Sequence, residues 1–222
     1  MKNQKTAILL GGTGLTGGLL LGKLIADPTY ISIKLFSRRE SGINSPKVRE
    51  YVVDLFQMEK YKEAFTADEV FCCIGTTSAK TSDRDIYRAI DYGIPVTASR
   101  LARDNHIPTF IVISSLGANP RSRIFYSRTK GEMEEAVLAQ NIPHTYILRP
   151  SLILGKRKEK RFGESAGAII LKVAQVFLQG RFRKYRSIEA GCIADAMMQL
   201  ARTLPDMQIV ASDIIQKLGN DS

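Results

Sequence analysis

Residues 11–18 read Gly11-Gly12-Thr13-Gly14-Leu15-Thr16-Gly17-Gly18, and this glycine-rich stretch lies between a strand-like and a helix-like segment. The apolar run at residues 6–10 precedes it, and the leucine-rich residues 19–25 follow it directly. A strand that ends in a glycine turn and leads into a helix presents free backbone N–H groups and the positive end of the helix dipole to an anion. This order therefore predicts a βα unit whose turn binds the pyrophosphate of a dinucleotide.

The spacing of the glycines adds detail to this prediction. Gly11, Gly14 and Gly17 form the pattern G-x-x-G-x-x-G, which is one residue off the dinucleotide fingerprint G-x-G-x-x-G. We expect Gly11 to make the tight turn, Gly14 to let the backbone approach the phosphate, and Gly17 to let the helix pack closely on the strand. The other residues of the predicted phosphate-binding turn are Thr13, Leu15 and Thr16.

Length and composition indicate one globular unit. The chain has 222 residues, of which 44% are hydrophobic and 24% charged, and a chain of this size buries about 70% of its unfolded surface. We expect a single domain over residues 1–222, with a dinucleotide-binding core at 1–150 and a substrate cover at 151–222. No uninterrupted apolar run reaches the length of about 18 residues that a membrane-spanning helix needs, so the expected location is the cytoplasm.

The N-terminus also resembles a secretory leader, because Lys2 and Lys5 precede an apolar stretch. Five glycines interrupt that stretch, and no small-x-small cleavage site follows before Asp27-Pro28. We therefore favour the nucleotide-binding turn over a leader.

The formal net charge of +10 is concentrated in one segment. Residues 156–186 hold ten basic residues against two acids, Glu159 and Glu164, so the rest of the chain is nearly balanced. An anionic substrate, a peripheral membrane surface or an acidic partner would each suit such a segment, and so would a solvated basic rim around the cofactor mouth. A role in nucleic-acid binding rests on charge alone, because the segment has few aromatic residues and no recognised binding motif.

The three cysteines, Cys72, Cys73 and Cys192, are an odd number without a C-x-x-C pair. Adjacent cysteines in a strand point to opposite faces, so we expect neither a metal site nor a disulfide framework. Cys72 and Cys73 are interpreted as buried structural thiols, whereas for Cys192 a reactive surface thiol stays open.

Strand-like and helix-like segments alternate along the first 150 residues, which indicates a Rossmann-type, doubly wound parallel α/β sheet. After Arg149-Pro150 the alternation stops, and we expect helices at 166–178 and 190–201, then a short strand and helix at 207–218. Ligands of such sheets bind beyond the carboxyl ends of the strands, so this C-terminal part is the predicted small helical cover of the site. The strands are expected at residues 6–10, 31–36, 50–53, 69–74, 109–114 and 145–148.

The residues after the second strand predict which dinucleotide binds. An NAD-preferring domain commonly has an Asp or Glu there, which accepts hydrogen bonds from the ribose 2′-hydroxyl, but this chain has Ser37, Arg38 and Arg39. Guanidinium groups bind a 2′-phosphate through paired, charge-assisted hydrogen bonds. We therefore expect NADP(H) to be preferred over NAD(H), with a solvated basic turn as the alternative.

Further cofactor contacts are expected where the third and fourth strands end. Asp54 and Leu55 follow the third strand, and Asp54 is also suited to cap the helix that begins at Leu55. Gly75, Thr76 and Thr77 follow the fourth strand, where this fold places the inner ribose or the nicotinamide. Thr76 and Thr77 are equally compatible with a simple turn.

Three polar side chains predict the chemistry. Tyr126 and Lys130 are four residues apart, a spacing that puts both on one face of a helix, and Ser115 ends the preceding strand, with Ser114 as its alternative. An ammonium group near a phenol stabilises the phenolate and lowers the pKa of the tyrosine, which suits general acid catalysis. A serine hydroxyl can polarise the reacting carbonyl. A Y-x-x-x-K pair on an ordinary exposed helix is the alternative.

Together these motifs resemble the short-chain dehydrogenase/reductase superfamily. The resemblance is closer to its atypical branch, the Tat-interacting-protein oxidoreductase family, with its NmrA-like and epimerase-like relatives, and it covers nearly the whole chain. The matching motifs are Cys72-Cys73-Ile74-Gly75-Thr76-Thr77, Ser114-Ser115-Leu116-Gly117-Ala118, Tyr126-x-x-x-Lys130-Gly131-Glu132-Met133-Glu134 and Arg149-Pro150.

The resemblance implies an NADP(H)-binding fold in which Tyr126 is the proton donor, Lys130 holds the nicotinamide ribose and Ser115 orients the substrate carbonyl. Pro150, after the sixth strand, completes the expected cofactor-binding set. Two functions follow: NADPH-dependent reduction of a carbonyl-like small molecule, or NADP(H) sensing without turnover. Sugar-nucleotide epimerases share these motifs but need a larger C-terminal domain than the roughly 70 residues that remain here.

Overall fold

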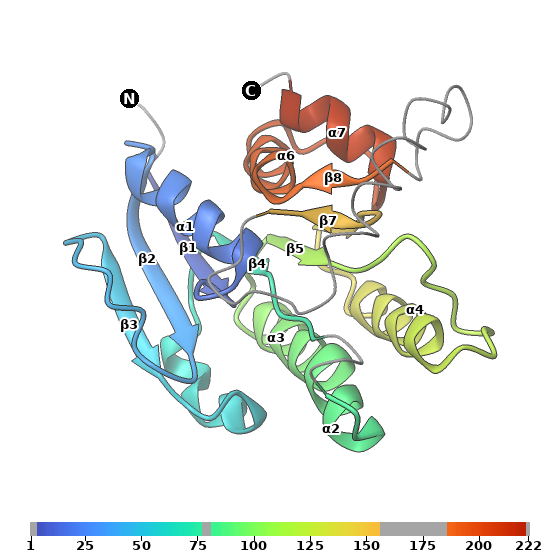
Figure 1. Cartoon of the computed structure of the whole chain (residues 1–222). Coiled ribbons are helices and arrows are strands. Elements are labelled where there is room, and N and C mark those ends of the chain that lie inside the picture. The colour runs from blue at the N-terminus through green and yellow to red at the C-terminus, as the bar shows by residue number, and fades with distance from the viewer. Residues whose placement is uncertain (1–3, 77–80, 156–185, 221–222) are drawn as a thin grey trace.

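A computed structural model describes residues 4–76, 81–155 and 186–220 of the chain (Figure 1). Its main element is a seven-stranded sheet, built from β1 (Lys5–Leu10), β2 (Tyr30–Ser37), β3 (Val48–Val52), β4 (Glu69–Cys72), β5 (Thr109–Ile113), β6 (His144–Arg149) and β9 (Ile209–Ala211). The strand order is β3-β2-β1-β4-β5-β6-β9, and every neighbouring pair is parallel. The predicted Rossmann-type sheet is confirmed, and each of the expected strands is present.

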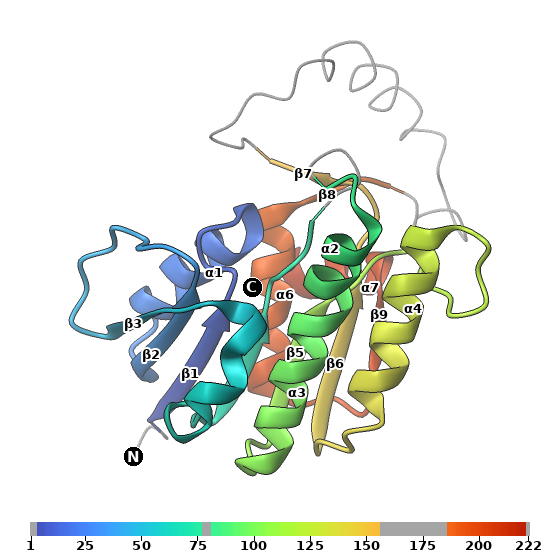
Figure 2. The same cartoon turned by 90° about the horizontal axis from the view of Figure 1, so that it is seen from below.

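Helices cover both faces of the sheet, as Figures 1 and 2 show. They are α1 (Leu15–Ala26), the 3₁₀ helix η1 (Leu55–Ala64), α2 (Arg84–Arg88), the π-helix η2 (Ala89–Gly93), α3 (Ile94–Asp104), α4 (Phe125–Leu138), α6 (Ala190–Thr203) and α7 (Ser212–Asn220). α1, α6 and α7 pack on one face, and η1, α3 and α4 pack on the other. None of the helices among the described residues is long and apolar enough to span a bilayer.

The residues of β1 alternate between two hydrophobic cores. Ala7 and Leu9 belong to the core beneath α1 and α6, whereas Ile8 and Leu10 belong to the core beneath η1, α3 and α4. All four are fully buried. A central parallel strand that is covered on both faces is apolar at every position, which explains the continuous apolar run in the sequence.

The start of β1 is held by a cluster of polar side chains at the amino end of the sheet. Lys5 Nζ donates hydrogen bonds to the Glu69 carboxylate and to the carbonyl oxygen of Ala201, the latter at 3.0 Å. The Tyr30 hydroxyl donates to the other oxygen of Glu69, which is only 2% exposed. The cluster therefore ties β1, β2 and β4 to the last turn of α6.

All three cysteines are free thiols; Cys72, the last residue of β4, is buried as expected, whereas Cys73, the next residue, is only half-buried. Cys72 lies in the core beneath α3, and Cys73 packs against the core on the opposite face. Cys192 is half-buried in α6, and burial raises the pKa of its thiol, which disfavours a reactive thiolate at neutral pH. Within the described ranges, no three His, Cys, Asp or Glu side chains gather as a metal ion would require.

The C-terminal part differs in placement from the predicted cover. α6 confirms the helix expected at 190–201, and β9 and α7 confirm the strand and helix expected at 207–218, but the helix expected at 166–178 lies outside the described residues. α6 packs against α1 on one face of the sheet. The carboxyl edge is instead approached by a short parallel pair that we did not predict, β7 (Ile153–Leu154) and β8 (Ile188–Glu189) (Figure 2).

Candidate cofactor and active site

The turn between β1 and α1 has a shape that requires glycine at two positions. Gly11 has a φ of +82°, which side chains rarely permit, and a Cβ atom there would lie 2.8 Å from the carbonyl oxygen of Cys73. A Cβ atom on Gly17 would lie 2.2 Å from the carbonyl oxygen of Gly11. The first turn of α1 therefore packs directly against the glycine turn, which is the geometry expected of these two residues.

The start of α1 is suited to an anion. Gly14 caps the helix without a side chain, so no side-chain oxygen accepts hydrogen bonds from the amides of the first turn. Those amides have no acceptor within the helix either, and the positive end of the helix dipole lies at the same place. Thr13 and Gly14 are exposed, Leu15 is half-buried and Thr16 is buried. Open backbone, absent side chains and a positive field together fit the pyrophosphate of a dinucleotide.

Two exposed guanidinium groups follow the carboxyl end of β2, which is the strand next to β1 and its glycine turn. Arg38 and Arg39 are exposed, and neither has an ion-pair partner in the part of the chain that the structure describes. Ser37 is buried, and its hydroxyl donates to the carbonyl oxygen of Arg39 at 2.7 Å. This bond holds the turn that carries both arginines.

The residues after β3 have two different environments. The Asp54 carboxylate accepts a hydrogen bond from the Phe56 amide at 3.0 Å and caps η1, so the predicted capping role is confirmed. Asp54 is exposed at the surface. Leu55 is buried in the core beneath η1, so its side chain serves packing.

The loop after β4 reaches the lysine predicted to be catalytic. A Cβ atom on Gly75 would lie 3.5 Å from Asp91 Oδ1 and 3.7 Å from Lys130 Nζ. The Thr76 amide donates to Asp91 Oδ2 at 2.8 Å. Thr77 lies outside the described residues. The loop is therefore in contact with the buried charges that surround Lys130.

Lys130 forms a buried ion pair with Asp91, a residue that the sequence analysis did not single out. The Nζ to Oδ1 distance is 2.7 Å, and the two side chains are 4% and 0% exposed. Burial favours the neutral amine, but the Asp91 carboxylate holds the pKa of Lys130 above its usual value. Asp91 lies in the π-helix η2, a feature that is frequent at functional sites. Its only signal in the sequence is a single acid within an otherwise uncharged helical stretch, residues 89–93.

Tyr126 lies one turn before Lys130 on α4 and is half-buried against α2. Its ring meets the ring of Tyr87 edge-on, with the centroids 6.0 Å apart and an interplanar angle of 62°. The Tyr87 hydroxyl is buried and lies near the Asp91 carboxylate. Burial and the neighbouring Asp91 carboxylate raise the pKa of Tyr87, so this phenol stays protonated.

The two adjacent serines after β5 differ in their partners. The Ser114 hydroxyl is buried and donates to the carboxylate of Glu134. The Ser115 hydroxyl oxygen is also buried, but it has no hydrogen-bond partner within the described ranges. A buried hydroxyl without a partner is costly unless a ligand or water completes it. The hydroxyl of Ser114 is therefore occupied, whereas that of Ser115 has no partner within the described ranges.

The glycine turn and the loops that follow β4, β5 and β6 adjoin one another at the carboxyl ends of the central strands. The glycine turn after β1 touches Cys73 at the end of β4, and the loop that continues from there reaches Lys130. The loop after β5 is joined to the end of β6, because the Leu116 amide donates to the carbonyl oxygen of Pro150 at 2.9 Å. Figure 2 shows this edge of the sheet, with β7 and β8 beyond it.

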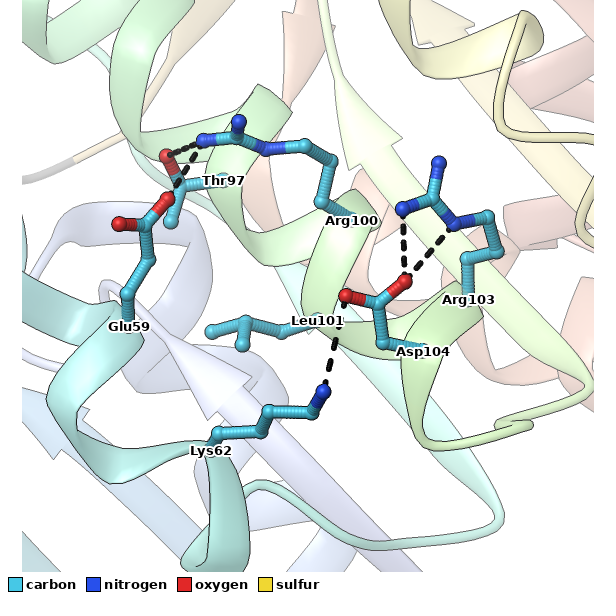
Figure 3. Close-up of a pocket in the computed structure, with 7 residues that line it drawn as sticks. All are labelled: Glu59, Lys62, Thr97, Arg100, Leu101, Arg103 and Asp104. Carbon is cyan, nitrogen blue, oxygen red and sulfur yellow. Dashed lines mark hydrogen bonds and ion pairs between the residues drawn. The ribbon is translucent and has the colours of Figure 1, made fainter.

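A cavity of about 280 Å³ lies elsewhere, between η1 and the last turns of α3 (Figure 3). Its charged side chains pair with one another: Arg100 with Glu59 at 2.7 Å, and Arg103 with Asp104 at 2.6 Å. Lys62 approaches Asp104 at 3.9 Å. Because these acids and bases satisfy one another, we assign no function to this cavity.

Comparison with known proteins identifies the family. A family model described as NAD(P)H-binding matches residues 11–171, which is well over half of the chain. The chain belongs to the NAD(P)H-binding family. The match begins at Gly11, the first glycine of the turn, and it includes every residue that we predicted for the site, up to Pro150.

Curated relatives match most of the chain and correct one expectation. Protein FMP52, mitochondrial, from Candida albicans is 30% identical over 225 residues, which cover 97% of this chain and 98% of the relative. Protein fmp52-1, mitochondrial, from Aspergillus terreus is 35% identical over 170 residues, which cover 73% of this chain and 72% of the relative. The expected cytoplasmic location is wrong by this finding, because the lack of a membrane-spanning run does not distinguish the cytoplasm from the mitochondrion.

Solved structures share the fold. The UDP-glucose 4-epimerase of Thermotoga maritima, solved with UDP-glucose, has a TM-score of 0.69 at 16% identity, over 97% of this chain and 82% of the epimerase. A short-chain dehydrogenase/reductase superfamily protein from Agrobacterium tumefaciens, solved with bound NAD, has a TM-score of 0.65 at 15% identity, over 88% of this chain and 73% of that protein. At these identities the likeness concerns the fold alone.

Gly17→Ala is expected to destabilise the protein by about 3 kcal/mol, because the added methyl group overlaps the carbonyl oxygen of Gly11. Gly22→Ala in the same helix is the matched control. Nothing lies within 4 Å of the Cβ atom that it adds, and alanine is the better helix former by about 1 kcal/mol. Urea unfolding measures both variants, and equal stability would contradict the close packing of α1 on the turn.

Asp91→Asn is expected to lower the free energy of unfolding by about 3 kcal/mol at neutral pH, because it leaves the buried Lys130 without a counter-charge. In the native protein the raised pKa of Lys130 makes the pair stabilising at neutral pH, and this contribution is lost as pH rises through the folded pKa. In the variant, only the burial of Lys130 acts on its amine, and burial favours the neutral form. The difference in stability between the native protein and the variant should therefore shrink as pH rises.

Urea unfolding near neutral pH and at about pH 10, where a free lysine side chain begins to lose its proton, measures this change. Asp85→Asn, at an exposed position in α2, is the control and should show no such pH dependence. A deficit for Asp91→Asn that stays constant with pH would contradict the ion pair as the cause.

Proposed function

We propose that the protein is an NADP(H)-dependent oxidoreductase of the atypical short-chain dehydrogenase/reductase type, which reduces a carbonyl-like small molecule. The observation that carries the proposal is the buried, charged Lys130 one helical turn from Tyr126. Membership of the NAD(P)H-binding family supports the cofactor class. The motifs that resemble the Tat-interacting-protein oxidoreductase family support the same type of enzyme, and the names of the FMP52 relatives support a mitochondrial location.

In the proposed reaction, bound NADPH supplies a hydride to the carbonyl carbon. Tyr126 donates its phenolic proton to the carbonyl oxygen, which becomes the hydroxyl of the product. Ser115 donates a hydrogen bond to the same oxygen and polarises the carbonyl. Lys130 keeps a positive charge near the phenolate that Tyr126 leaves behind and also binds the cofactor ribose. Asp91 keeps Lys130 charged in its buried position.

Different parts of the dinucleotide are proposed to bind at the carboxyl ends of different strands. The amides of the glycine turn and of the first turn of α1 bind the pyrophosphate. Arg38 and Arg39 bind the 2′-phosphate, which makes NADP(H) the preferred cofactor. Asp54, exposed after β3, lies on the adenine side, and the loop with Thr76 and the end of β6 with Pro150 lie on the nicotinamide side.

The substrate is proposed to be anionic. Ten basic residues lie in residues 156–186, which belong to the part of the chain that follows β7. The second candidate function is NADP(H) sensing without turnover, in which cofactor occupancy changes the affinity for a partner. In that case an acidic partner or a peripheral membrane surface would bind to the same basic segment. This segment shows no nucleic-acid-binding motif, so no nucleic acid is proposed.

Arg38→Ala is expected to weaken NADPH binding about tenfold or more and to leave NADH binding unchanged, because only NADPH carries the phosphate that loses a charge-assisted partner. Arg100→Ala, which removes the same charge beside the cavity of Figure 3, is the control. Fluorescence titration with both nucleotides measures the affinities. An equal loss for both nucleotides would contradict the role of Arg38, and a native protein that binds neither would overturn the proposed function.

Tyr126→Phe is expected to bind NADPH with unchanged affinity and to lower turnover about 100-fold or more, because it removes only the proton donor. Tyr61→Phe in η1 removes a hydroxyl outside the site and is the control. NADPH oxidation is followed with a panel of aldehydes, ketones and quinones. Equal turnover in Tyr126→Phe would exclude Tyr126 from the mechanism, and NADPH binding without reduction of any compound would favour the sensing function.

A further inference from the structure

Glu134 is a buried carboxylate that lies one turn beyond Lys130 on α4, so that Tyr126, Lys130 and Glu134 share one face of the helix. Its side chain is only 3% exposed. It is surrounded by donors from two other elements, the end of β5 and the end of β6. Neither the family match nor the predicted site assigns it a role.

The donors to Glu134 are Ser114 and Arg149. The Ser114 hydroxyl donates to Oε1. Arg149 Nε lies 3.0 Å from Oε1 and 3.1 Å from Oε2, and Arg149 Nη2 also donates to Oε2. Bidentate pairing of this kind is both stronger and more directional than a neutral hydrogen bond. The hydrogen bonds from Arg149 to Glu134 also raise the pKa of the guanidinium.

The loop after β5 is held to α4 at a second place. The Asn119 amide donates to the carbonyl oxygen of Ser127 at 2.9 Å. A Cβ atom on Gly131 would lie 2.2 Å from the backbone nitrogen of Pro120, so helix and loop are in van der Waals contact there. The loop that carries Ser115 is thus held between Glu134 at its start and residues 127–131 at its end.

We propose that Glu134 is a positioning residue that selects Ser115 over Ser114. By accepting the Ser114 hydroxyl, it removes that serine from the site, and by binding Arg149 it fixes the ends of β5 and β6 relative to the Tyr126 and Lys130 face of α4. The Ser115 hydroxyl is left buried and unpartnered within the described residues, ready to bind the substrate oxygen. This inference rests on the proposed function for its chemical meaning, but its structural part is tested separately.

Glu134→Gln keeps the shape of the side chain and removes its charge. Glu135→Gln, at the next and exposed position, is the matched control. Hydrogen exchange is measured at the amides of Leu116 and Asn119, which bond to Pro150 and Ser127, with the amides of β1 as reference. We expect exchange in the loop to become about tenfold faster in Glu134→Gln, with β1 unchanged and the control equal to the native protein.

Two further readouts separate positioning from general stability. NADPH affinity should change less than about twofold, because the glycine turn is untouched, while kcat for any carbonyl compound that the native protein reduces should fall about tenfold or more, with little change in KM. Arg149→Lys, which keeps the charge but loses the bidentate geometry, should give a smaller loss of the same kind.

The inference is overturned if loop exchange in Glu134→Gln equals that of the native protein, or if it rises equally in β1, which would mean that Glu134 only stabilises the fold. If Glu134→Gln does not fold, Arg149→Lys decides the same question by the same measurement. A native protein that binds NADPH and reduces no compound would remove the proposed reductase, and loop exchange alone would then decide whether Glu134 holds the loop.

Discussion

The buried ion pair between Lys130 and Asp91 is the interaction on which the site depends. Removing two charges from water is costly, and a pair of this kind persists only where its geometry is good and its remaining atoms are hydrogen-bonded. Here the second oxygen of Asp91 accepts the Thr76 amide, so the pair joins α4, η2 and the loop after β4. A shift of α4 or η2 would leave a buried charge without its partner, and a shift of the loop would leave one oxygen of Asp91 without its hydrogen bond, so the pair keeps the helix with Tyr126 in register with the sheet.

The glycine turn and the ion pair meet through β4. Gly11 contacts the backbone of Cys73, and two residues later Gly75 lies beside Asp91 and Lys130. The glycine turn and a buried ammonium group are thus connected by the few residues that follow β4. The sheet supplies the rigidity for this arrangement, because its central strands are packed on both faces.

Much of the fold was predictable because the pattern is periodic. Apolar runs bounded by turn residues located the strands, and the spacing of Tyr126 and Lys130 predicted their common face. Asp91 was not predictable, because a single acid within a helix has no period and gains its meaning only from contact with Lys130. Ser114 and Ser115 were equally ambiguous, since only the position of Glu134 tells which hydroxyl is occupied. Strands of two residues, such as β7 and β8, are too short for any pattern to mark.

The contact between Lys5 and Ala201 has a consequence for biosynthesis. β1 is a central strand, yet the helix that completes its surroundings, α6, is made only after nearly all the other strands of the sheet. Until then, the core that α1 and α6 share on this face of the sheet is incomplete, and part of its apolar surface stays open to water. A chain in which α6 has not yet been made, or from which it is deleted, therefore exposes apolar surface, and this face of the sheet cannot be completed until α6 is present.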